Sequence, residues 1–362
     1  METWILGGTG RSGRAIAAEL PARGITPVLV GRDAARLERA AERVGGGART
    51  VVAGTVEAAI AQIRRQRPAV VVSTVGPFRA TAVPIARACL SAGAHYVDLA
   101  NEVASLSAVL DLDDTATAAG RTVVTGAGFG VTATESVVVA LCAGRPVPAE
   151  VRVHMIPSLA IEAGAVGAAL AATMLDGLPG VGGGRRFQGR RFRGGRLAPA
   201  RLGGDATRLT LPDGTVVRTV SVPLGELVAA QRASGAPDVT AASSEMAALR
   251  HVLPVASVLL ESAALRRFAV RRLARVRFPD RPRPRAHSWG YARVRWADGT
   301  VREGWLRVGE AQGYTGAIPA EVARRLLAGE GRPGAHTPAA LFGPSLAESC
   351  GGEYLLPAGA ER

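Results

Sequence analysis

The chain contains no lysine, so all 44 of its basic side chains are arginines. This absence excludes reactions that pass through a lysine Schiff base and active sites built on a Tyr-x-x-x-Lys pair. Cysteine is also scarce, because the chain has only Cys89, Cys142 and Cys350, far apart and without a CxxC pair. Such sparse cysteine favours reduced thiols over a disulfide framework, and we therefore expect a cytoplasmic protein.

Long apolar segments and metal-ligand patterns are missing as well. No uninterrupted apolar run reaches the length of about 18 residues typical of a membrane-spanning helix. The chain opens on an apolar strand, so we also expect no signal peptide. No histidine is spaced with cysteine, aspartate or glutamate as a metal ligand would be, and we predict no metal site. What the chain does have is a net charge of +14, which favours anionic partners.

The opening stretch WILGGTGRSG, residues 4–13, contains the most informative motif. A short apolar strand ends in glycines, and a helical pattern starts at once. In this context the spacing Gly8-x-Gly10-x-x-Gly13 is a dinucleotide-binding fingerprint. Its glycines allow a tight turn, close approach of a pyrophosphate and close packing of helix on strand. We expect the cofactor to be bound by Gly8, Thr9, Gly10, Arg11, Ser12 and Gly13.

The end of the second predicted strand indicates which dinucleotide binds. NAD-binding domains carry an acidic residue about 20 residues past the glycines, where it holds the ribose 2′-hydroxyl. Here Arg32 occupies that zone. A guanidinium suits a 2′-phosphate, so we predict NADP as the cofactor. Asp33, which follows, is interpreted as the N-cap of a helix over residues 34–44.

The remaining pattern predicts two domains of the α/β class. Apolar strands alternate with helical segments up to about residue 145, which predicts a Rossmann domain with a doubly wound parallel sheet. These strands are expected at 25–30, 49–53, 69–75, 95–99 and 122–125, and the helices at 34–44, 54–67, 84–92 and 131–142. Beyond it, a strand at 150–156, a Gly/Ala-rich helix from about residue 160 and hairpins at 209–222 and 292–306 predict an α+β substrate and dimerisation domain over residues 146–317. Helices at 319–327 and 338–346 would form the remainder, residues 318–362.

Residues 180–204 are dense in glycine and arginine with interleaved phenylalanines. Such a segment is sometimes found in nucleic-acid-binding proteins. We instead favour an antiparallel hairpin with turns at residues 188–189 and 194–195, and predict no nucleic-acid partner.

Several motifs in the first half of the chain resemble the saccharopine dehydrogenase-like NADP-dependent reductases. The motifs are VGPF at residues 75–78, AC at 88–89, GAHYVDLANE at 93–102, and GF at 128–129 followed by TE at 134–135. Later segments at 278–279, 313–314 and 334–338 are similar to the trans-acting enoyl reductase branch. The resemblance implies an NADP-binding Rossmann domain, a mixed-sheet substrate domain and C-terminal helices that return to the first domain. Asn101 and Gly130 depart from the family pattern, which has glycine and aspartate there.

Residues after the fourth and fifth predicted strands are candidates for the active site, because ligands of open α/β sheets bind beyond the carboxyl ends of the strands. Gly76, Pro77 and Phe78 are expected to wall the nicotinamide, the alternative being a tight turn with a core phenylalanine. Tyr96 and Asp98 share one face of their strand, and we predict that one of them donates a proton. Asp98 alternatively caps a helix or binds a backbone amide. Glu102 is a less favoured candidate, and Tyr314 is interpreted chiefly as structural.

These observations predict an NADPH-dependent reductase that acts on a C=C or C=N bond of a small-molecule or carrier-bound substrate in specialised metabolism. The alternative is an NADP-binding sensor or scaffold without turnover. Sequence leaves the substrate, the direction of reaction and homodimer formation open.

The segment Arg266–Arg285 is strongly basic, with apolar residues at helical spacing. Three interpretations remain open: a solvated surface helix with a proline-stiffened loop, a helix on a membrane surface, or a dock for an acidic partner. The resemblance implies that this partner is an acidic carrier protein. In that hypothesis Leu265, Phe268 and Leu273 anchor the helix to the enzyme, and Arg271 and Arg272 are exposed.

Overall fold

The computed structural model describes residues 2–160, 164–165, 188–245, 262–278 and 282–357. The chain divides into two compact units. The first unit comprises residues 1–132 and 311–352, and the second comprises residues 133–310 and 353–362. The boundaries therefore differ from those expected at residues 145 and 317. The helix over residues 129–142, which was expected to close the Rossmann domain, is divided between the two units, and the last short strand, residues 353–355, belongs to the second unit.

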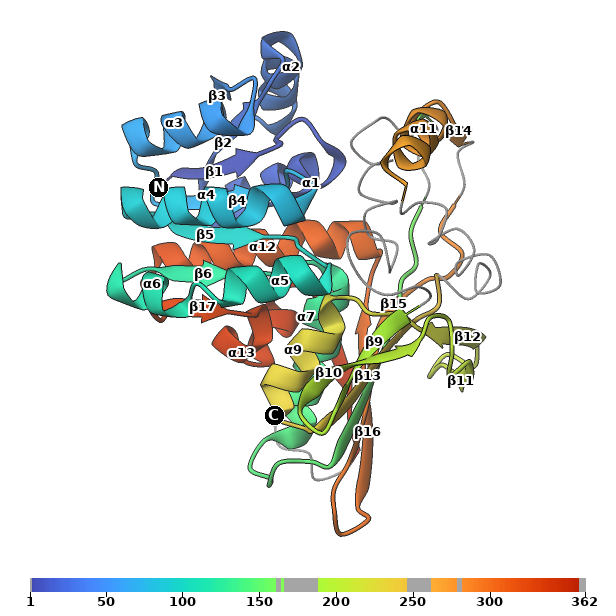
Figure 1. The fold of residues 1–362 in the computed structure, drawn as a ribbon. Helices are drawn as coiled ribbons and strands as arrows, with labels where there is room; N and C mark the ends of the chain where they lie inside the picture. The colour runs from blue at the N-terminus through green and yellow to red at the C-terminus, as the bar shows by residue number, and fades with distance from the viewer. Residues whose placement is uncertain (1, 161–163, 166–187, 246–261, 279–281, 358–362) are drawn as a thin grey trace. The chain divides into compact units, whose positions relative to one another are not determined.

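The first unit is built on a seven-stranded parallel sheet in the order β17-β6-β5-β4-β1-β2-β3 (Figure 1). Its strands are β1 (Glu2–Leu6), β2 (Thr26–Gly31), β3 (Arg49–Val52), β4 (Val70–Ser73), β5 (His95–Asp98), β6 (Thr122–Val124) and β17 (Gly334–His336). All four residues of β4 are buried, as expected for a central strand covered by helices on both faces. This confirms the predicted doubly wound sheet.

Helices cover both faces of this sheet. The chain forms α1 (Arg11–Glu19), η1 (Pro21–Arg23), α2 (Ala34–Val44), α3 (Val56–Gln66), α4 (Phe78–Ala92), α5 (Val103–Leu110), α6 (Asp113–Ala118), α7 (Phe129–Cys142), α12 (Ala311–Leu327), α13 (Pro338–Phe342) and α14 (Ser345–Ser349). Helix α4 lies between α3 and α5 on one face, whereas α1 contacts α2 and α12 on the other (Figure 1).

The predicted starts of two helices were wrong, because Pro84 and Pro319 lie inside α4 and α12 rather than at their first turns. Proline removes one backbone donor from a helix interior. Extensive burial of each helix compensates for this loss: Ile85 beside the first proline and Ile318 beside the second are both 0% exposed.

The C-terminal part of the first unit is fixed by a buried ion-pair cluster. Glu321 of α12 pairs with Arg325 of the same helix at 3.0 Å and with Arg23 of η1 at 3.4 Å. The Arg325 guanidinium also lies 5.4 Å from the centre of the Phe342 ring in α13. The contact of Arg23 with Glu321 joins residues 298 positions apart in sequence and ties α12 to η1.

The second unit is built on a nine-stranded mixed sheet. Its main path has the order β10-β9-β13-β7-β15-β16-β18, and β11 and β12 join it through β13. The strands are β7 (Glu150–Ile156), β9 (Gln188–Arg193), β10 (Arg196–Arg201), β11 (Thr207–Thr210), β12 (Val216–Ser221), β13 (Asp238–Ser243), β15 (Ser288–Arg295), β16 (Val301–Val308) and β18 (Glu353–Leu355). A separate pair is formed by β8 (Gly164–Ala165) and β14 (Arg277–Phe278), and the other described helices of this unit are α9 (Gly225–Ser234) and α11 (Ala263–Ala274). The expectation of a second α+β domain is therefore confirmed.

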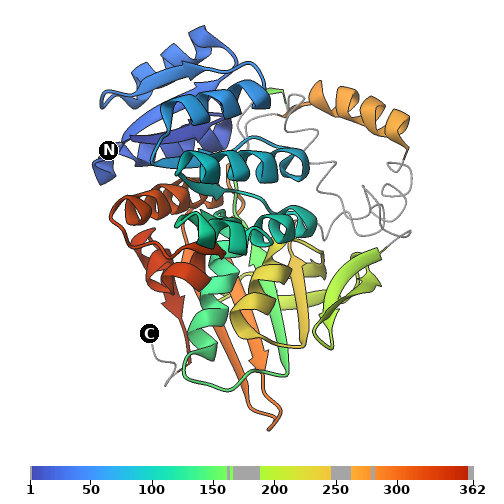
Figure 2. The same ribbon diagram turned by 60° about the vertical axis from the view of Figure 1, so that its left-hand side comes forward.

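Helices α7 and α9 pack on one face of the second sheet (Figure 2). Helix α7 lies very close to β15, since a Cβ added to Gly290 would lie 2.7 Å from the backbone of Ala133. On the opposite face, Trp289 and Tyr291 form an apolar cluster with Leu211 and Val217.

Local turn chemistry predicted the hairpins of this unit well. Gly214 and Gly299 have φ of 83° and 85° and turn the β11–β12 and β15–β16 hairpins. Gly194 and Gly195 turn the β9–β10 hairpin with φ of 58° and 75°. The other predicted turn, at residues 188–189, is wrong because these residues belong to β9. The predicted helix from about residue 160 lies largely outside the described residues.

Candidate cofactor site and active site

The glycine loop after β1 has the geometry of a phosphate cradle. The amides of Gly7 and Gly8 both donate to the Val30 carbonyl, at 2.9 and 3.1 Å, and fix the start of the loop. A Cβ at Gly13 would lie 2.3 Å from the Gly7 carbonyl oxygen, which no side chain tolerates. In contrast, a Cβ at the exposed Gly10 would meet only that same oxygen, at 3.1 Å. The outer side of the loop is therefore open to a ligand.

Helix α1 begins at this loop and offers its positive end to a ligand. The N-cap residue is Gly10, which has no side chain to bind the first-turn amides. A pyrophosphate can accept from these amides and is favoured by the helix dipole. The guanidinium of Arg14 donates to the Thr9 carbonyl at 3.0 Å, and Gln312 of α12 donates to the Ser12 hydroxyl at 3.3 Å. Both contacts hold the loop in place.

The sheet topology places the loop where dinucleotides bind. Strand β1 has β4 on one side and β2 on the other. The order of strands therefore reverses next to β1, which makes this position the topological switch point of the sheet. Ligands of open α/β sheets bind in the crevice at this point, beyond the carboxyl ends of the strands.

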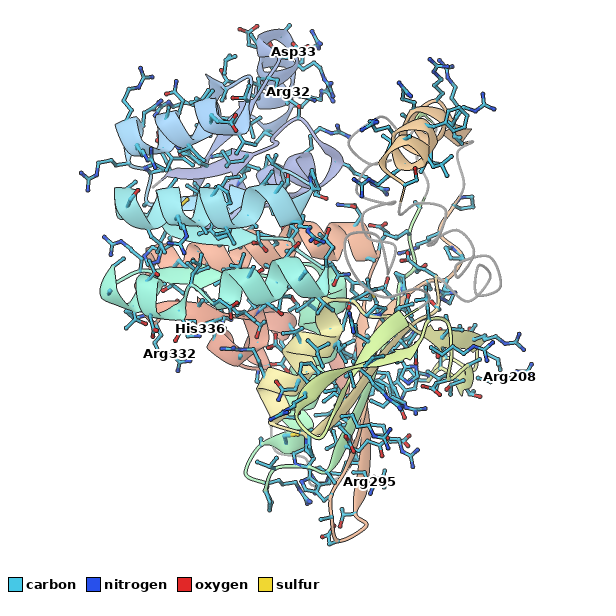
Figure 3. All side chains as sticks on the ribbon, viewed as in Figure 1. Arg32, Asp33, Arg208, Arg295, Arg332 and His336 are labelled. Carbon is cyan, nitrogen blue, oxygen red and sulfur yellow. The ribbon has the colours of Figure 1, made fainter. Side chains whose placement is uncertain are left out.

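Arg32 and Asp33 lie at the carboxyl end of β2, and both are exposed (Figure 3). The Asp33 carboxylate accepts a hydrogen bond from the Arg36 amide at 3.0 Å and caps α2, as the sequence predicts. This acidic side chain is thus used by the helix. Arg32 remains as the charge available at the strand end, which fits a 2′-phosphate better than a ribose hydroxyl.

The loop after β4 is tied to its surroundings by two threonines. Thr74 donates to the Leu6 carbonyl at 2.9 Å, and Thr81 donates to the Val75 carbonyl at 2.6 Å. The Gly76–Pro77 peptide bond in this loop is cis. Both residues are half-buried, and both remain candidates to contact the nicotinamide.

Phe78 is more deeply buried than Gly76 and Pro77. As the first residue of α4 its side chain is buried, with 8% exposed. Phe78 therefore matches the alternative of a core phenylalanine after a tight turn.

Tyr96 and Asp98, the two predicted proton donors, are each 0% exposed. One carboxylate oxygen of Asp98, Oδ1, accepts from the Ala100 amide at 2.9 Å, the Thr125 hydroxyl at 2.8 Å and the Gly126 amide at 3.1 Å. These contacts match the other interpretation given for Asp98, binding of backbone amides, and they tie the loop after β5 to the loop after β6.

Several buried polar atoms at these two groups have no hydrogen-bond partner among the described residues. The Tyr96 hydroxyl faces Asp98 and Ser73, yet Oδ2 of Asp98, the Ser73 hydroxyl and the Tyr96 hydroxyl complete no regular hydrogen bond. Burial raises the pKa of Asp98 despite the donors around its other oxygen. Burial, together with the Asp98 charge, raises the pKa of Tyr96 well above its usual range.

Glu102 is the acidic residue that follows β5 with partial access to solvent. It occupies the N-cap position of α5, but its side chain forms no capping hydrogen bond. Its Oε2 is buried without a hydrogen-bond partner among the described residues. The sequence favoured Tyr96 and Asp98 over Glu102, because the strand period does not show that the first two side chains are buried. The position of Glu102 after the strand, in a loop, was the feature of the sequence that could have indicated its partial exposure.

Tyr314 belongs to the core of the first unit. Its side chain is 4% exposed, and the hydroxyl donates to the Ala347 carbonyl at 3.3 Å. Its ring meets Phe129 edge to face, with 6.2 Å between ring centres. These contacts give Tyr314 a structural role, as the sequence favours.

The described residues include neither a metal-ligand cluster nor a membrane-spanning helix. No group of three or more histidine, cysteine, aspartate or glutamate side chains is placed to hold a metal ion in the described part of the chain. Of the helices described, none is long and apolar enough to cross a bilayer.

Comparison with known proteins identifies the nucleotide-binding part of the chain. Residues 3–124 match the family described as the saccharopine dehydrogenase NADP binding domain. This match supports NADP as the cofactor of the first unit. The chain as a whole has the fold of saccharopine dehydrogenase.

Superposition on one solved structure supports the fold over the full length. The L-glutamate-forming saccharopine dehydrogenase of Saccharomyces cerevisiae is 12% identical and superposes with a TM-score of 0.61, covering 99% of this chain and 100% of the yeast chain. GenD2 from gentamicin A biosynthesis, solved with NAD, is 15% identical over 99% of this chain and 96% of its own, with a TM-score of 0.43. No curated protein matches the chain by sequence.

Proposed function

We propose that this protein is an NADPH-dependent reductase of a C=C or C=N bond. The observation that carries the proposal is the arrangement at the ends of β1 and β2. There an open glycine loop lies beside Arg32, while Asp33 is engaged by α2. Bound NADPH supplies a hydride. The similarity to trans-acting enoyl reductases supports a C=C acceptor, presented as a small molecule or on a carrier.

The residues of the chain have separate tasks in this proposal. The glycine loop and the first turn of α1 hold the pyrophosphate, and Arg32 holds the 2′-phosphate. Gly76 and Pro77 border the nicotinamide. Asp98 fixes the loops after β5 and β6 at the carboxyl edge of the sheet, without contact to substrate.

Reduction of a C=C or C=N bond adds a proton as well as a hydride, so a proton donor is needed. We propose Glu102 for this task, because its Oε2 has no partner among the described residues and the side chain is only partly buried. It can also bind the nitrogen of an imine substrate. Its loop is held by the Asp98 contact to Ala100, two residues before it.

Oxidation of NADPH with matched substrates tests the function. The purified chain is incubated with NADPH and a panel of α,β-unsaturated thioesters and cyclic imines, and consumption of NADPH and formation of reduced product are measured. Turnover of one class with product formation supports the proposal and identifies the acceptor bond. Saturated thioesters and amines serve as controls.

The second candidate is an NADP-binding sensor or scaffold. The burial of both Tyr96 and Asp98 favours it, because the chain then has few acid–base groups at the sheet edge. Tight NADPH binding without oxidation by any member of either substrate class would favour this candidate over the reductase.

A further inference from the structure

Helix α11 has an outward face on which arginines alternate with apolar side chains. Phe268 is 57% exposed and Leu265 is 46% exposed. Arg267, Arg271 and Arg272 are exposed beside them. We call these five residues the Arg/Phe face. The exposure of Arg271 and Arg272 agrees with the sequence-based hypothesis, whereas the predicted anchoring of Leu265 and Phe268 to the enzyme is wrong.

Helical geometry explains the error. Phe268 and Leu273 are five residues apart and thus about 140° apart around the helix axis. Leu273 lies on the half-buried side with Ala269 and Val270. The apolar residues of the helix are thus spread over two sides. Only the side with Leu273 is half-buried, and Phe268 faces solvent.

The charge around this face is unbalanced. Residues 262–278 contain six arginines and no acidic residue. None of these arginines takes part in an ion pair among the described residues. At the far end of the predicted basic segment, the Arg285 guanidinium donates to the Pro157 carbonyl and is half-buried.

We propose that the Arg/Phe face docks on an anionic phospholipid surface. Guanidinium groups bind phosphate oxygens in a two-pronged geometry, and an anionic bilayer attracts basic segments over a Debye length. Phenylalanine and leucine at the same depth enter the boundary between headgroups and acyl chains. The helix would lie along the surface, and the inference does not depend on the reductase activity.

The interleaving of the two kinds of side chain favours lipid over an acidic protein. A bilayer presents phosphates and hydrocarbon side by side over its whole plane, so the Arg/Phe face needs no matching pocket. An acidic protein would need apolar cavities placed between its carboxylates to receive Phe268 and Leu265. The sequence-based hypothesis placed an acidic carrier protein at this segment. The experiment must therefore distinguish binding to an acidic protein from binding to an anionic bilayer.

Vesicle flotation of the full chain tests the proposal. We expect binding to vesicles of phosphatidylcholine mixed with phosphatidylglycerol, none to pure phosphatidylcholine, and weaker binding as salt shortens the screening length. The double variant Arg271→Gln/Arg272→Gln should reduce the partition coefficient by about tenfold or more. Phe268→Ser should also weaken binding, and its effect should persist at high salt, because it removes an apolar contact.

A matched control removes the same charge elsewhere in the second unit. Arg208, labelled in Figure 3, and Arg218 are exposed and are paired across the β11–β12 hairpin. Arg208→Gln/Arg218→Gln should bind the mixed vesicles almost as well as the unchanged chain. Thermal melting and NADPH affinity should be the same in all variants.

Three results would overturn the proposal. The first is no binding to the mixed vesicles at low salt. The second is an equal loss of binding in the Arg208/Arg218 control, which would show that binding depends on the net charge of the chain and not on the Arg/Phe face. The third is binding to polyglutamate, but not to vesicles, that is lost in the Arg271/Arg272 variant. That result would assign the face to an acidic protein partner.

Discussion

Oδ1 of Asp98 and the hydroxyl of Thr125 lie 2.8 Å apart, and both side chains are 0% exposed. The contact joins the end of β5 to the residue that follows β6. With the amides of Ala100 and Gly126 on the same oxygen, it makes two neighbouring loops at the carboxyl edge of the sheet one rigid element. The Asp98 carboxylate thus holds the two loops in position relative to each other.

The first prediction concerns the choice of cofactor. We expect the unchanged chain to bind NADPH more than about tenfold more tightly than NADH, which corresponds to roughly 1.4 kcal/mol. Arg32→Ala should remove most of this preference and leave NADH affinity nearly unchanged, because only the 2′-phosphate contact is lost. Titration with both cofactors measures it. Arg39→Ala on the exposed side of α2 is the control, and equal affinities in the unchanged chain would refute the role of Arg32.

The second prediction concerns the glycine loop. Gly13→Ala places a Cβ 2.3 Å from the Gly7 carbonyl oxygen, so the loop or the helix must move, at a cost of about 1–3 kcal/mol in the free energy of unfolding. NADPH affinity should fall with it. At Gly309, in the second unit, a Cβ meets nothing within 4 Å. Gly309→Ala should therefore leave both quantities unchanged, and a tolerated Gly13→Ala would contradict the cradle geometry.

The third prediction separates catalysis from binding. If Glu102 donates the proton, Glu102→Gln should lower kcat by about 100-fold or more, with NADPH affinity intact. Tyr96→Phe is the comparison, because its hydroxyl is buried away from substrate and its loss should change kcat little. Steady-state kinetics with the substrate found by the NADPH oxidation screen supply both values. Normal turnover by Glu102→Gln would show that the donor is another group or water.

The fourth prediction concerns the buried carboxylate. Asp98→Ala leaves three buried donors without an acceptor, each at a cost of about 1–3 kcal/mol, so it should be strongly destabilised. Asp98→Asn keeps the acceptor and should retain most turnover. Because burial raises the pKa of Asp98 above 3.8, the folded state holds the proton more tightly than the unfolded state does.

This protonation has a pH signature. The stabilisation associated with the Asp98 proton is fully present below pH 3.8 and is lost as pH rises through the raised pKa of the folded state. The stability advantage of the unchanged chain over Asp98→Asn should therefore shrink as pH rises in this range. Urea unfolding at several pH values measures it. An advantage that grows with pH would contradict the direction of the shift.

The fifth prediction concerns His154 in the second sheet. Its Nδ1 lies 2.9 Å from the Thr219 hydroxyl, and burial, helped by the charge of Arg152, lowers its pKa from 6.5 to about 3. The unfolded state then binds a proton that the folded state does not between these two pH values. Stability from this group should be present above pH 6.5 and decline by about 1.4 kcal/mol per pH unit below it.

The variant His154→Phe tests this slope. It removes the titrating group and should flatten the pH dependence of unfolding between pH 6.5 and about 3, whatever it costs in absolute stability. His287→Phe is the matched control, because that histidine is half-buried. An unchanged slope in His154→Phe would assign the acid sensitivity to another group.

Features fixed by a few neighbouring residues were predictable from the sequence. The glycine loop, the Asp33 cap of α2 and the turns at Gly214 and Gly299 each depend on local backbone geometry or on a hydrogen bond across three residues. Residue types alone indicate such features, because the partners are adjacent in the chain. For the same reason the alternation of strands and helices predicted the doubly wound sheet.

Features that depend on distant contacts were not predictable in this way. Residues 334–336 join the sheet as β17 beside β6, more than 200 positions away. The strand period places Tyr96 and Asp98 on one face, but the packed structure buries both side chains. Only this burial makes Glu102 the favoured candidate for the proton donor. Likewise, helical spacing alone does not show which side of α11 packs inward. Burial is a property of the whole packed chain, because a side chain is covered by residues that come from anywhere in the sequence, and it decides whether a polar group meets a ligand or holds the fold.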